Sequence, residues 1–503
     1  MAETQKMIRS IRLILAMTVL FPVIAGFPSG GALQAEDISE TDLSTAKVHP
    51  RWQSQAVMNS SRDRLSFFTA DVDNIYIQSS AGVVTALNAD TGRKLWASQI
   101  GLNDESSLAA VSNDDVLLIT TGPVIHAVNK FTGNELFKFR LPGQPSTPPA
   151  VDNGSLYVSL LDGTVAGMSL RTLEHQERFG TLPPGVARAV AWRFVSGDPV
   201  SFSPIAGTES IAIATDKGNF HSINSQGIQA GKSIFQLLLK SPVVAPMTLY
   251  PGPAGDTVLV ATEDHRLHSI GFSKSGKINW TYPLTSTISA PMIVVGDDAF
   301  VITERTGLTK FSLSGGVPVK IPDNGKQWNV PNIEQMVAVS KDYVYAMDIT
   351  NRLLKINRAS AELEHHVTLN DHTFRLSNGL TDRIFLATAS GTVVCLAEDG
   401  SDFATYHQRP GRQPLMPELQ DKPDDSAPAT EETPDTESDS DTSDSDSESA
   451  PSPGDAGFSD SIPHGRRQRA CGHFNSFCNL IAVSYGNAHE FTVPASCSGQ
   501  CQR

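Results

Sequence analysis

Short apolar segments separated by polar turns recur along most of the chain. In each unit an apolar run is followed by a tight polar turn with Gly or Asp and a second apolar run. A further polar turn comes next, and an aromatic residue often follows it. The clearest unit spans residues 75–96, IYIQSSAGVVTALNADTGRKLW. Alternating runs rich in Val, Ile, Leu and Tyr favour β-strands, so each unit predicts paired strands joined by short turns.

Eight copies of this unit follow one another. Adjacent copies start about 40 to 47 residues apart, except for a gap of 55 residues between the third and the fourth. The copies start near Ile75, Val116, Leu156, Ile211, Val258, Ala299, Tyr343 and Ile384. A unit of this length cannot bury both of its faces alone, whereas a closed ring of such units covers the faces and removes exposed edges. We therefore predict an all-β, eight-bladed β-propeller over residues 36–407, with seven blades as the alternative.

A ring of this kind needs a device that closes it. Residues 51–68 precede the first copy and are strand-like, while the last copy ends near residues 404–406. We expect the N-terminal strand to share a blade with the C-terminal strands.

The N-terminus has the layout of a secretory signal peptide. Lys6, Arg9 and Arg12 precede the apolar run Leu13–Phe27, and small residues lead to Ala35. The run has 15 residues, fewer than the roughly 20 that a membrane-spanning helix needs, and the pattern predicts cleavage after Ala35. We expect domain 1–35 to direct export to the periplasm or cell envelope, with an uncleaved anchor as the alternative. The mature chain has no other apolar stretch long enough to cross a membrane.

Charge is concentrated in one segment. The chain of 503 residues has a net charge of −15, and residues 421–463 carry 14 acidic side chains and one lysine. The rest is therefore close to neutral and lacks the basic surface of a nucleic-acid-binding protein. Residues 408–463 show no apolar periodicity and contain a Ser/Asp run, which predicts a disordered, solvated segment; weak cation binding is a sharper alternative.

The cysteines divide between the repeats and the C-terminal segment, residues 464–503. Cys395 lies in an apolar run and is expected to be a small buried residue. The other four are Cys471, Cys478, Cys497 and Cys501. Two disulfides are consistent with export, and a zinc site or an unstructured, abnormal terminus are the alternatives that remain open.

Residues 86–96, ALNADTGRKLW, resemble the A-L-D-x-x-T-G-x-x-x-W signature of quinoprotein-type (PQQ-like) propeller repeats. The resemblance extends over residues 36–407. It implies that Thr-Gly forms the turn between the last two strands of a blade and that the aromatic residue packs between blades. The signature residues are Thr91, Gly92 and Trp96 in the first copy, Thr132, Gly133 and Phe137 in the second, and Gly276 and Trp280 in the fifth.

This family contains two functional classes. Quinoprotein dehydrogenases hold pyrroloquinoline quinone, usually with calcium, in the central channel, and many have adjacent cysteines over the quinone. This chain has no Cys-Cys pair, and no catalytic residue of that class can be carried over. His265 and His268 lie three apart, so on a strand they point to opposite faces and do not predict a shared metal.

The second class is non-catalytic and resembles the exported propeller lipoprotein of the outer-membrane β-barrel assembly machine, which docks other proteins. The chain departs from that protein in having no cysteine near residue 35 for lipid attachment. We expect a monomeric, non-catalytic scaffold with envelope proteins as partners and without cofactor or metal. A pyrroloquinoline-quinone-dependent dehydrogenase is the alternative.

The 55-residue gap locates extra chain at roughly residues 182–204. It contains Trp192, Arg193 and Phe194. Loops at the ends of a propeller channel often carry function, and aromatic and arginine side chains are frequent binding hot spots. This segment is therefore either an exposed docking loop or a longer strand pair within a blade.

Overall fold

The computed structural model describes residues 38–103, 105–181, 190–252, 255–273 and 276–408, together with the backbone of residues 482–484. The predicted signal peptide, the acidic segment beyond residue 408 and the four C-terminal cysteines lie outside these residues. The predictions for them therefore stay predictions.

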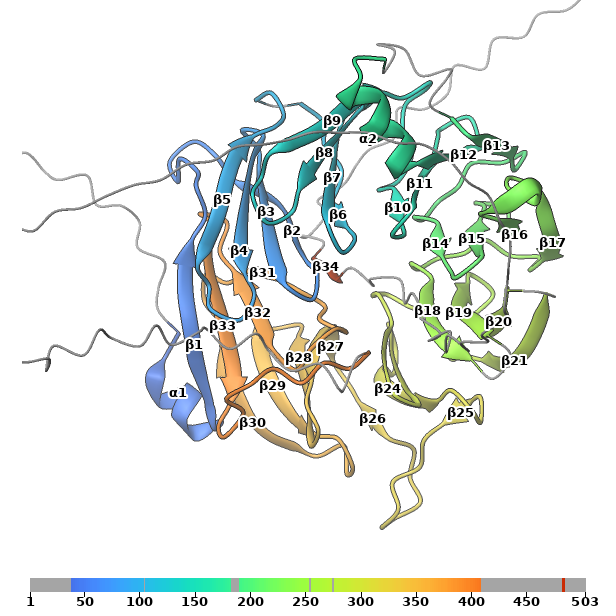
Figure 1. Ribbon diagram of the computed structural model, residues 1–503. Helices are drawn as coiled ribbons and strands as arrows, with labels where there is room; N and C mark the ends of the chain where they lie inside the picture. The colour runs from blue at the N-terminus through green and yellow to red at the C-terminus, as the bar shows by residue number, and fades with distance from the viewer. Residues whose placement is uncertain are drawn as a thin grey trace, which may run out of the picture.

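Eight antiparallel sheets stand around a central axis and form a ring (Figure 1). Each described copy of the sequence repeat supplies one sheet, so the eight-bladed prediction is confirmed and the seven-bladed alternative is wrong. Blade 1 contains β2 (Leu65–Ala70), β3 (Asn74–Ser79), β4 (Val83–Asn88) and β5 (Lys94–Gln99). Blade 2 contains β6 (Val111–Ser112), β7 (Val116–Thr121), β8 (Val124–Asn129) and β9 (Glu135–Arg140). Blade 3 contains β10 (Ala150–Val151), β11 (Ser155–Ser159), β12 (Thr164–Ser169) and β13 (Trp192–Val195). Blade 4 contains β14 (Ile205–Ala206), β15 (Ser210–Ala214), β16 (Asn219–Asn224) and β17 (Ser233–Leu238).

The second half of the ring repeats this arrangement with small variations. Blade 5 contains β18 (Thr248–Gly252), β19 (Gly255–Thr262), β20 (Arg266–Gly271) and β21 (Lys277–Pro283). Blade 6 contains β22 (Ile293–Val295), β23 (Asp298–Thr303), β24 (Gly307–Ser312), β25 (Val317–Pro318) and β26 (Asn329–Val330). Blade 7 contains β27 (Ile333–Val339), β28 (Tyr343–Asp348), β29 (Arg352–Asn357) and β30 (Leu363–Thr368). Blade 8 contains β31 (Phe374–Arg375), β32 (Ile384–Ala387), β33 (Thr392–Glu398) and, from the start of the chain, β1 (Val48–Gln55).

The ring is closed by β1. This strand pairs antiparallel with β33, from Val48 opposite Glu398 to Gln55 opposite Thr392, and so forms the outer strand of blade 8. The expectation that the N-terminal strand shares a blade with C-terminal strands is thereby confirmed. The short helix α1 (Glu40–Thr45) precedes β1, and Leu43 of this helix packs in the cluster between blades 7 and 8.

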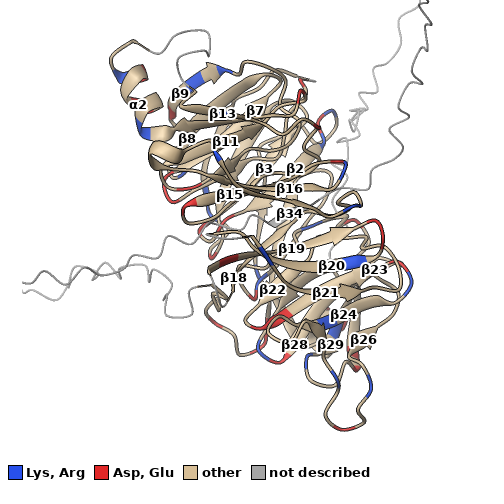
Figure 2. Cartoon of the chain, turned by 90° about the vertical axis from the view of Figure 1, so that its right-hand side faces the viewer, with Lys and Arg blue, Asp and Glu red and all other residues tan. Residues whose placement is uncertain are grey.

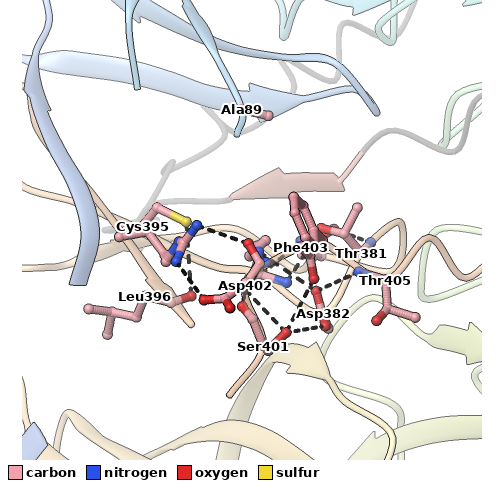
Figure 3. A network of polar contacts seen from close by, with 12 residues as sticks. Ala89, Thr381, Asp382, Cys395, Leu396, Ser401, Asp402, Phe403 and Thr405 are labelled. Atoms are coloured by element: carbon pink, nitrogen blue, oxygen red, sulfur yellow. Dashed lines mark hydrogen bonds and ion pairs between the residues drawn. The ribbon is translucent and has the colours of Figure 1, made fainter. Parts of the chain in front are cut away.

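A network of polar contacts reinforces this closure after β33 ends (Figure 3). Asp382, in the turn before β32, accepts hydrogen bonds from the Thr405 backbone N–H at 3.0 Å and from Ser401 Oγ at 3.3 Å. Arg51 of β1 donates to the Asp402 backbone oxygen at 2.9 Å. The chain after β33 is thus tied both to its own blade and to the N-terminal strand.

The core lies between blades. The two middle strands of each blade are buried almost throughout, as in β3, where all six residues are buried. Both of their faces meet apolar side chains, because each blade is covered by its two neighbours, and their sequences are correspondingly continuous apolar runs. Cys395 on β33 is 1% exposed, as expected, and burial raises the pKa of its thiol to about 12.

Helix α2 (Leu170–Arg178) is the main feature that the repeat pattern does not predict. It begins directly after β12, with Ser169 Oγ accepting from the Thr172 backbone N–H, and it buries Leu170 and Leu173 against blade 2. The extra chain of the 55-residue gap therefore lies between β12 and β13, from residue 170 to 191, rather than at residues 182–204. Residues 182–189 lie outside the described part of the chain.

Candidate docking surface

An aromatic residue in the outer strand of one blade packs on a turn of the next blade. Trp96 Nε1 donates to the Lys130 backbone oxygen at 2.9 Å, and a Cβ atom at Gly133 would lie 2.6 Å from the Trp96 ring. Gly133 has φ +74°, and Thr132 bonds through its backbone N–H to Asn129 Oδ1. Two features therefore exclude a side chain at position 133: the positive φ of the backbone and the indole ring that lies over it.

The same contact joins other blades. Trp280 Nε1 donates to the Leu313 backbone oxygen at 2.8 Å and lies over Gly316, while Phe235 lies over Gly276. Thr91 and Gly92 form the equivalent turn in blade 1, where the ring above Gly92 belongs to Trp52 of β1. Phe137 instead packs in the cluster that contains Leu170 and Leu173, because α2 replaces the turn in blade 3.

Trp192 occupies the same position in blade 3. It pairs with Gly167, in the register in which Trp96 pairs with Ala86 and Trp280 with Ser269. Its ring lies 5.9 Å from that of Tyr157, and a Cβ atom at Gly231 of blade 4 would lie 2.8 Å from Trp192 Cβ and 3.1 Å from the ring. Trp192 is therefore the inter-blade aromatic of blade 3, separated from its turn by the inserted helix.

Trp192, Arg193 and Phe194 lie in strand β13, not in a loop. Trp192 and Phe194 are half-buried against blade 4, whereas Arg193 and Val195 are exposed. Successive side chains of a strand point to opposite faces. One face of β13 therefore holds blades 3 and 4 together, and the other is open to solvent.

A polar cluster connects the end of β13 to blade 4. Asp198 forms an ion pair with Lys217 and accepts a hydrogen bond from Asn219 Nδ2 at 3.1 Å. The Lys217 hydrogen bond lowers the pKa of the Asp198 carboxyl. His221 lies behind this pair with its ring edge-on to Phe194, 5.2 Å away, and burial lowers its pKa.

Exposed apolar side chains occur on the segments that adjoin the cluster. Leu161 lies in the turn that contacts residues 196–198, and Leu238 pairs with Asn219 at the end of β17. Leu161 is 59%, Val195 67% and Leu238 60% exposed. Arg193 and Val195 lie on the face of β13 turned away from blade 4, and Leu161 and Leu238 lie on a neighbouring turn and strand end. We call these four exposed residues the blade 3–4 edge. Elsewhere on this side of the molecule, charged residues lie mainly at strand ends and in turns (Figure 2).

A buried ion pair stabilises the packing between blades 1 and 2. Lys130 Nζ lies 3.0 Å from Asp73 and 3.4 Å from Asp71, and its side chain is 2% exposed. Asp71 also accepts hydrogen bonds from Tyr76 and Ser112. These groups satisfy one another within the inter-blade layer, so they are not placed to act on a substrate.

The described residues contain no group of three or more His, Cys, Asp or Glu side chains arranged to hold a metal ion. His265 lies in a turn with φ +60°, whereas His268 is buried in β20 and bonds Thr281 Oγ1 at 2.9 Å. Among the same residues no helix has the length and apolar character of a membrane span.

The sequence model of one family, described as outer membrane protein assembly factor BamB, matches residues 80–216 and 186–405. The two matches together span more than half of the chain. The chain belongs to the BamB family. This confirms the resemblance to the non-catalytic branch of PQQ-like propellers.

Two curated BamB proteins are similar to it. That of Burkholderia pseudomallei is 24% identical over 355 residues, which cover 67% of this chain and 83% of that protein. That of Bordetella pertussis is 33% identical over 113 residues, or 22% of this chain and 27% of that protein.

Two solved structures are similar to the chain over most of their length. The computationally designed Ika8 protein has a TM-score of 0.50 at 12% identity, covering 68% of this chain and 98% of its own. BamB from Moraxella catarrhalis has a TM-score of 0.49 at 14% identity, covering 69% of this chain and 97% of its own.

Proposed function

We propose that this chain is a non-catalytic scaffold that docks proteins of the cell envelope in the service of outer membrane assembly. Membership of the BamB family carries this proposal. The ring supports it, because the aromatic contacts between blades fix the positions of the outer strands. Its place of action, on this proposal, is the periplasmic side of the envelope, where the predicted signal peptide would deliver it.

The blade 3–4 edge is the docking surface in this proposal. Arg193 stands between exposed apolar side chains on a strand whose opposite face is anchored in the core. Arginine beside apolar residues is a composition typical of binding hot spots. Because β13 is held by Trp192 and Phe194, the edge can bind a partner at little cost in ordering its own backbone.

Capture from a cross-linked envelope extract tests both statements. We expect the wild-type chain to enrich defined envelope proteins and Val195→Glu to lose them. Leu363→Glu is the matched control, because Leu363 is also exposed, at 52%, on an outer strand in the distant blade 7. An empty capture by the wild type contradicts the scaffold, and full capture by Val195→Glu contradicts this surface.

The dehydrogenase alternative has a direct test of its own. The purified chain is incubated with pyrroloquinoline quinone and calcium, and dye-linked oxidation of alcohols and sugars is followed. We expect no turnover above a chain-free control. Turnover that saturates with the quinone would replace the scaffold proposal by the enzymatic one.

A further inference from the structure

Blade 1 has a fifth strand that does not come from the repeats. Strand β34 (Ala482–Ser484) pairs antiparallel with β2, with Phe68 opposite Ser484, Thr69 opposite Val483 and Ala70 opposite Ala482. The other edge of β2 is bonded to β3, so β34 covers the inner edge of the blade. Figure 1 shows β34, in red, toward the middle of the ring.

The inner edge of β2 is well suited to accept a strand. Its sequence, LSFFTA, contains neither a charged residue nor proline, the two features with which proteins usually protect an open strand edge. Phe68 and Thr69 are fully buried, and Thr69 Oγ1 has no hydrogen-bond partner among the described residues. From Phe67 to Ala70 the strand pairs regularly with β3 on one edge, and its other edge faces β34.

The other inner strands lack this combination. Five of them are only two or three residues long, namely β6, β10, β14, β22 and β31. The longer β18 contains Pro251, and β27 carries Glu334 and two register shifts. Proline, charge and bulges each discourage the addition of a strand. β2 has one register shift of its own, between Leu65 and Phe67, and the Leu65 backbone N–H is bonded to Ala389. Beyond that shift, Phe67–Ala70 is a regular inner edge without proline or charge, which no other described inner strand combines with this length.

The segment between the ring and β34 is long enough for β34 both to bind this edge and to dissociate from it. Residues 409–481 connect it to the last described residue of the ring and include the acidic run. If the connection is disordered, as the sequence predicts for residues 408–463, a chain of that length spans on the order of 50 Å and holds its end at roughly millimolar effective concentration. Among the described residues three pairs join β34 to β2, and a pairing of that length opposes release with little energy.

We propose that the inner edge of blade 1, residues Phe68–Ala70, is a strand-binding site that the chain's own segment Ala482–Ser484 occupies reversibly. An extended polypeptide strand from another protein pairs with this edge when that segment leaves. The inference is independent of the blade 3–4 edge, which lies on outer strands. It adds a second surface, one that recognises backbone rather than a particular side chain.

Hydrogen exchange in the full chain tests the intramolecular half. Proline at positions 482 and 483 (Ala482→Pro with Val483→Pro) removes backbone donors from β34 without touching the ring. We expect the amides of Phe68 and Ala70 to exchange at least about tenfold faster in this variant, whereas the amide of Thr69 points to β3 and should be unchanged. Proline at Asn487 and Ala488 is the matched control and should leave the exchange of all three amides unchanged. Equal exchange of Phe68 and Ala70 in the wild type and the 482/483 variant overturns the proposal.

Peptide binding tests the other half. A labelled synthetic peptide that copies the sequence around Ala482–Ser484 is titrated into both proteins and followed by fluorescence anisotropy. We expect the 482/483 proline variant to bind it at least tenfold more tightly than the wild type, because the tethered segment competes. The same peptide with prolines at these two positions should not bind. Faster exchange without peptide binding overturns the claim that strands from other proteins use this edge.

Discussion

At the scale of single residues, an aromatic ring and a glycine decide how one blade meets the next. Trp96, Phe137 and Trp280 could be recognised from the sequence because each follows its Thr-Gly or Ser-Gly turn by four residues. Trp192 and Trp52 could not be recognised in this way. An inserted helix separates Trp192 from its turn, and Trp52 belongs to a strand more than 300 residues from its blade.

Gly133→Ala tests the restriction on the turn. The added methyl group would meet the Trp96 ring, and an L-residue at φ +74° is strained. We expect a loss of about 2–3 kcal/mol in the free energy of unfolding, measured with urea. Gly325→Ala is the control, because Gly325 has φ +68° but nothing within 4 Å of the new Cβ, and it should lose only about 1 kcal/mol. Equal losses would show that the indole contact does not matter.

Lys130→Ala tests the buried ion pair between blades 1 and 2. Removal of the ammonium leaves Asp71 buried, with its side chain 1% exposed, and without a positive charge. We expect a loss of about 3–5 kcal/mol in unfolding free energy. Lys138→Ala removes a solvent-exposed partner of Glu135 and should cost less than about 1 kcal/mol. A small effect of Lys130→Ala would mean that water enters the site.

His221 predicts a dependence of stability on pH. Burial lowers its pKa in the folded protein below the value of about 6.5 in the unfolded chain. Below pH 6.5 the unfolded state therefore binds a proton that the folded state rejects, and the free energy of unfolding falls. We expect urea titrations between pH 7.5 and 5 to show a smaller fall for His221→Phe than for the wild type. Identical pH profiles would contradict this.

At the scale of elements, the repeat pattern locates the strands well. Each of the eight repeat copies starts within the second strand of a blade, at most three residues after that strand begins. These strands are easy to recognise because they are buried on both faces and their sequences are continuous apolar runs. The exceptions are inserted between β12 and β13 and between β25 and β26. The α2 sequence, LRTLEHQER, is polar or charged apart from Leu170 and Leu173. Two apolar residues three apart are too few to show a helical periodicity of hydrophobic positions. In blade 6 a hairpin splits the outer strand and returns Trp328 to the core.

Trp192→Ala distinguishes packing from docking at β13. Loss of the indole empties the space between Tyr157 and Gly231, and removal of a packed Trp side chain typically costs 3–5 kcal/mol. We expect a clear fall in melting temperature. Arg193→Ala, on the exposed face of the same strand, should melt within about 1–2 °C of the wild type. An unchanged melting temperature for Trp192→Ala would show that Trp192 does not stabilise the packing of blades 3 and 4, and would favour a docking role for it.

At the scale of the whole molecule, the sequence predicted a closed ring and the shared blade, because hairpin repeats leave edges that only closure removes. It could not predict the partner on β2, since three residues of Ala, Val and Ser carry no distinctive pattern. Nor could it predict the blade 3–4 edge, whose exposed residues belong to two blades that are neighbours only in the ring.

Alkylation of Cys395 provides a measure of ring opening. The thiol is 1% exposed, its pKa is raised, and it pairs in register with Trp52 of β1. We expect Trp52→Ala to accelerate its native-state alkylation, mapped by mass spectrometry, at least about tenfold. Trp280→Ala removes the same kind of contact in blade 5 and should leave the Cys395 rate close to that of the wild type. Equal acceleration by both would mean that the ring opens only as a whole.

The pairing of β1 with β33 also sets an order in time. Gln55 and its partner Thr392 are 337 residues apart, so the first strand of the ring is made long before the strand that it must join. At typical synthesis rates of about 5–20 residues per second, that delay is on the order of 20–70 s. Throughout it blade 1 lacks the neighbour that covers Gly92, and β1 has no partner. The newborn chain is therefore most vulnerable at its beginning, and a holding chaperone would have the greatest effect on residues 38–70.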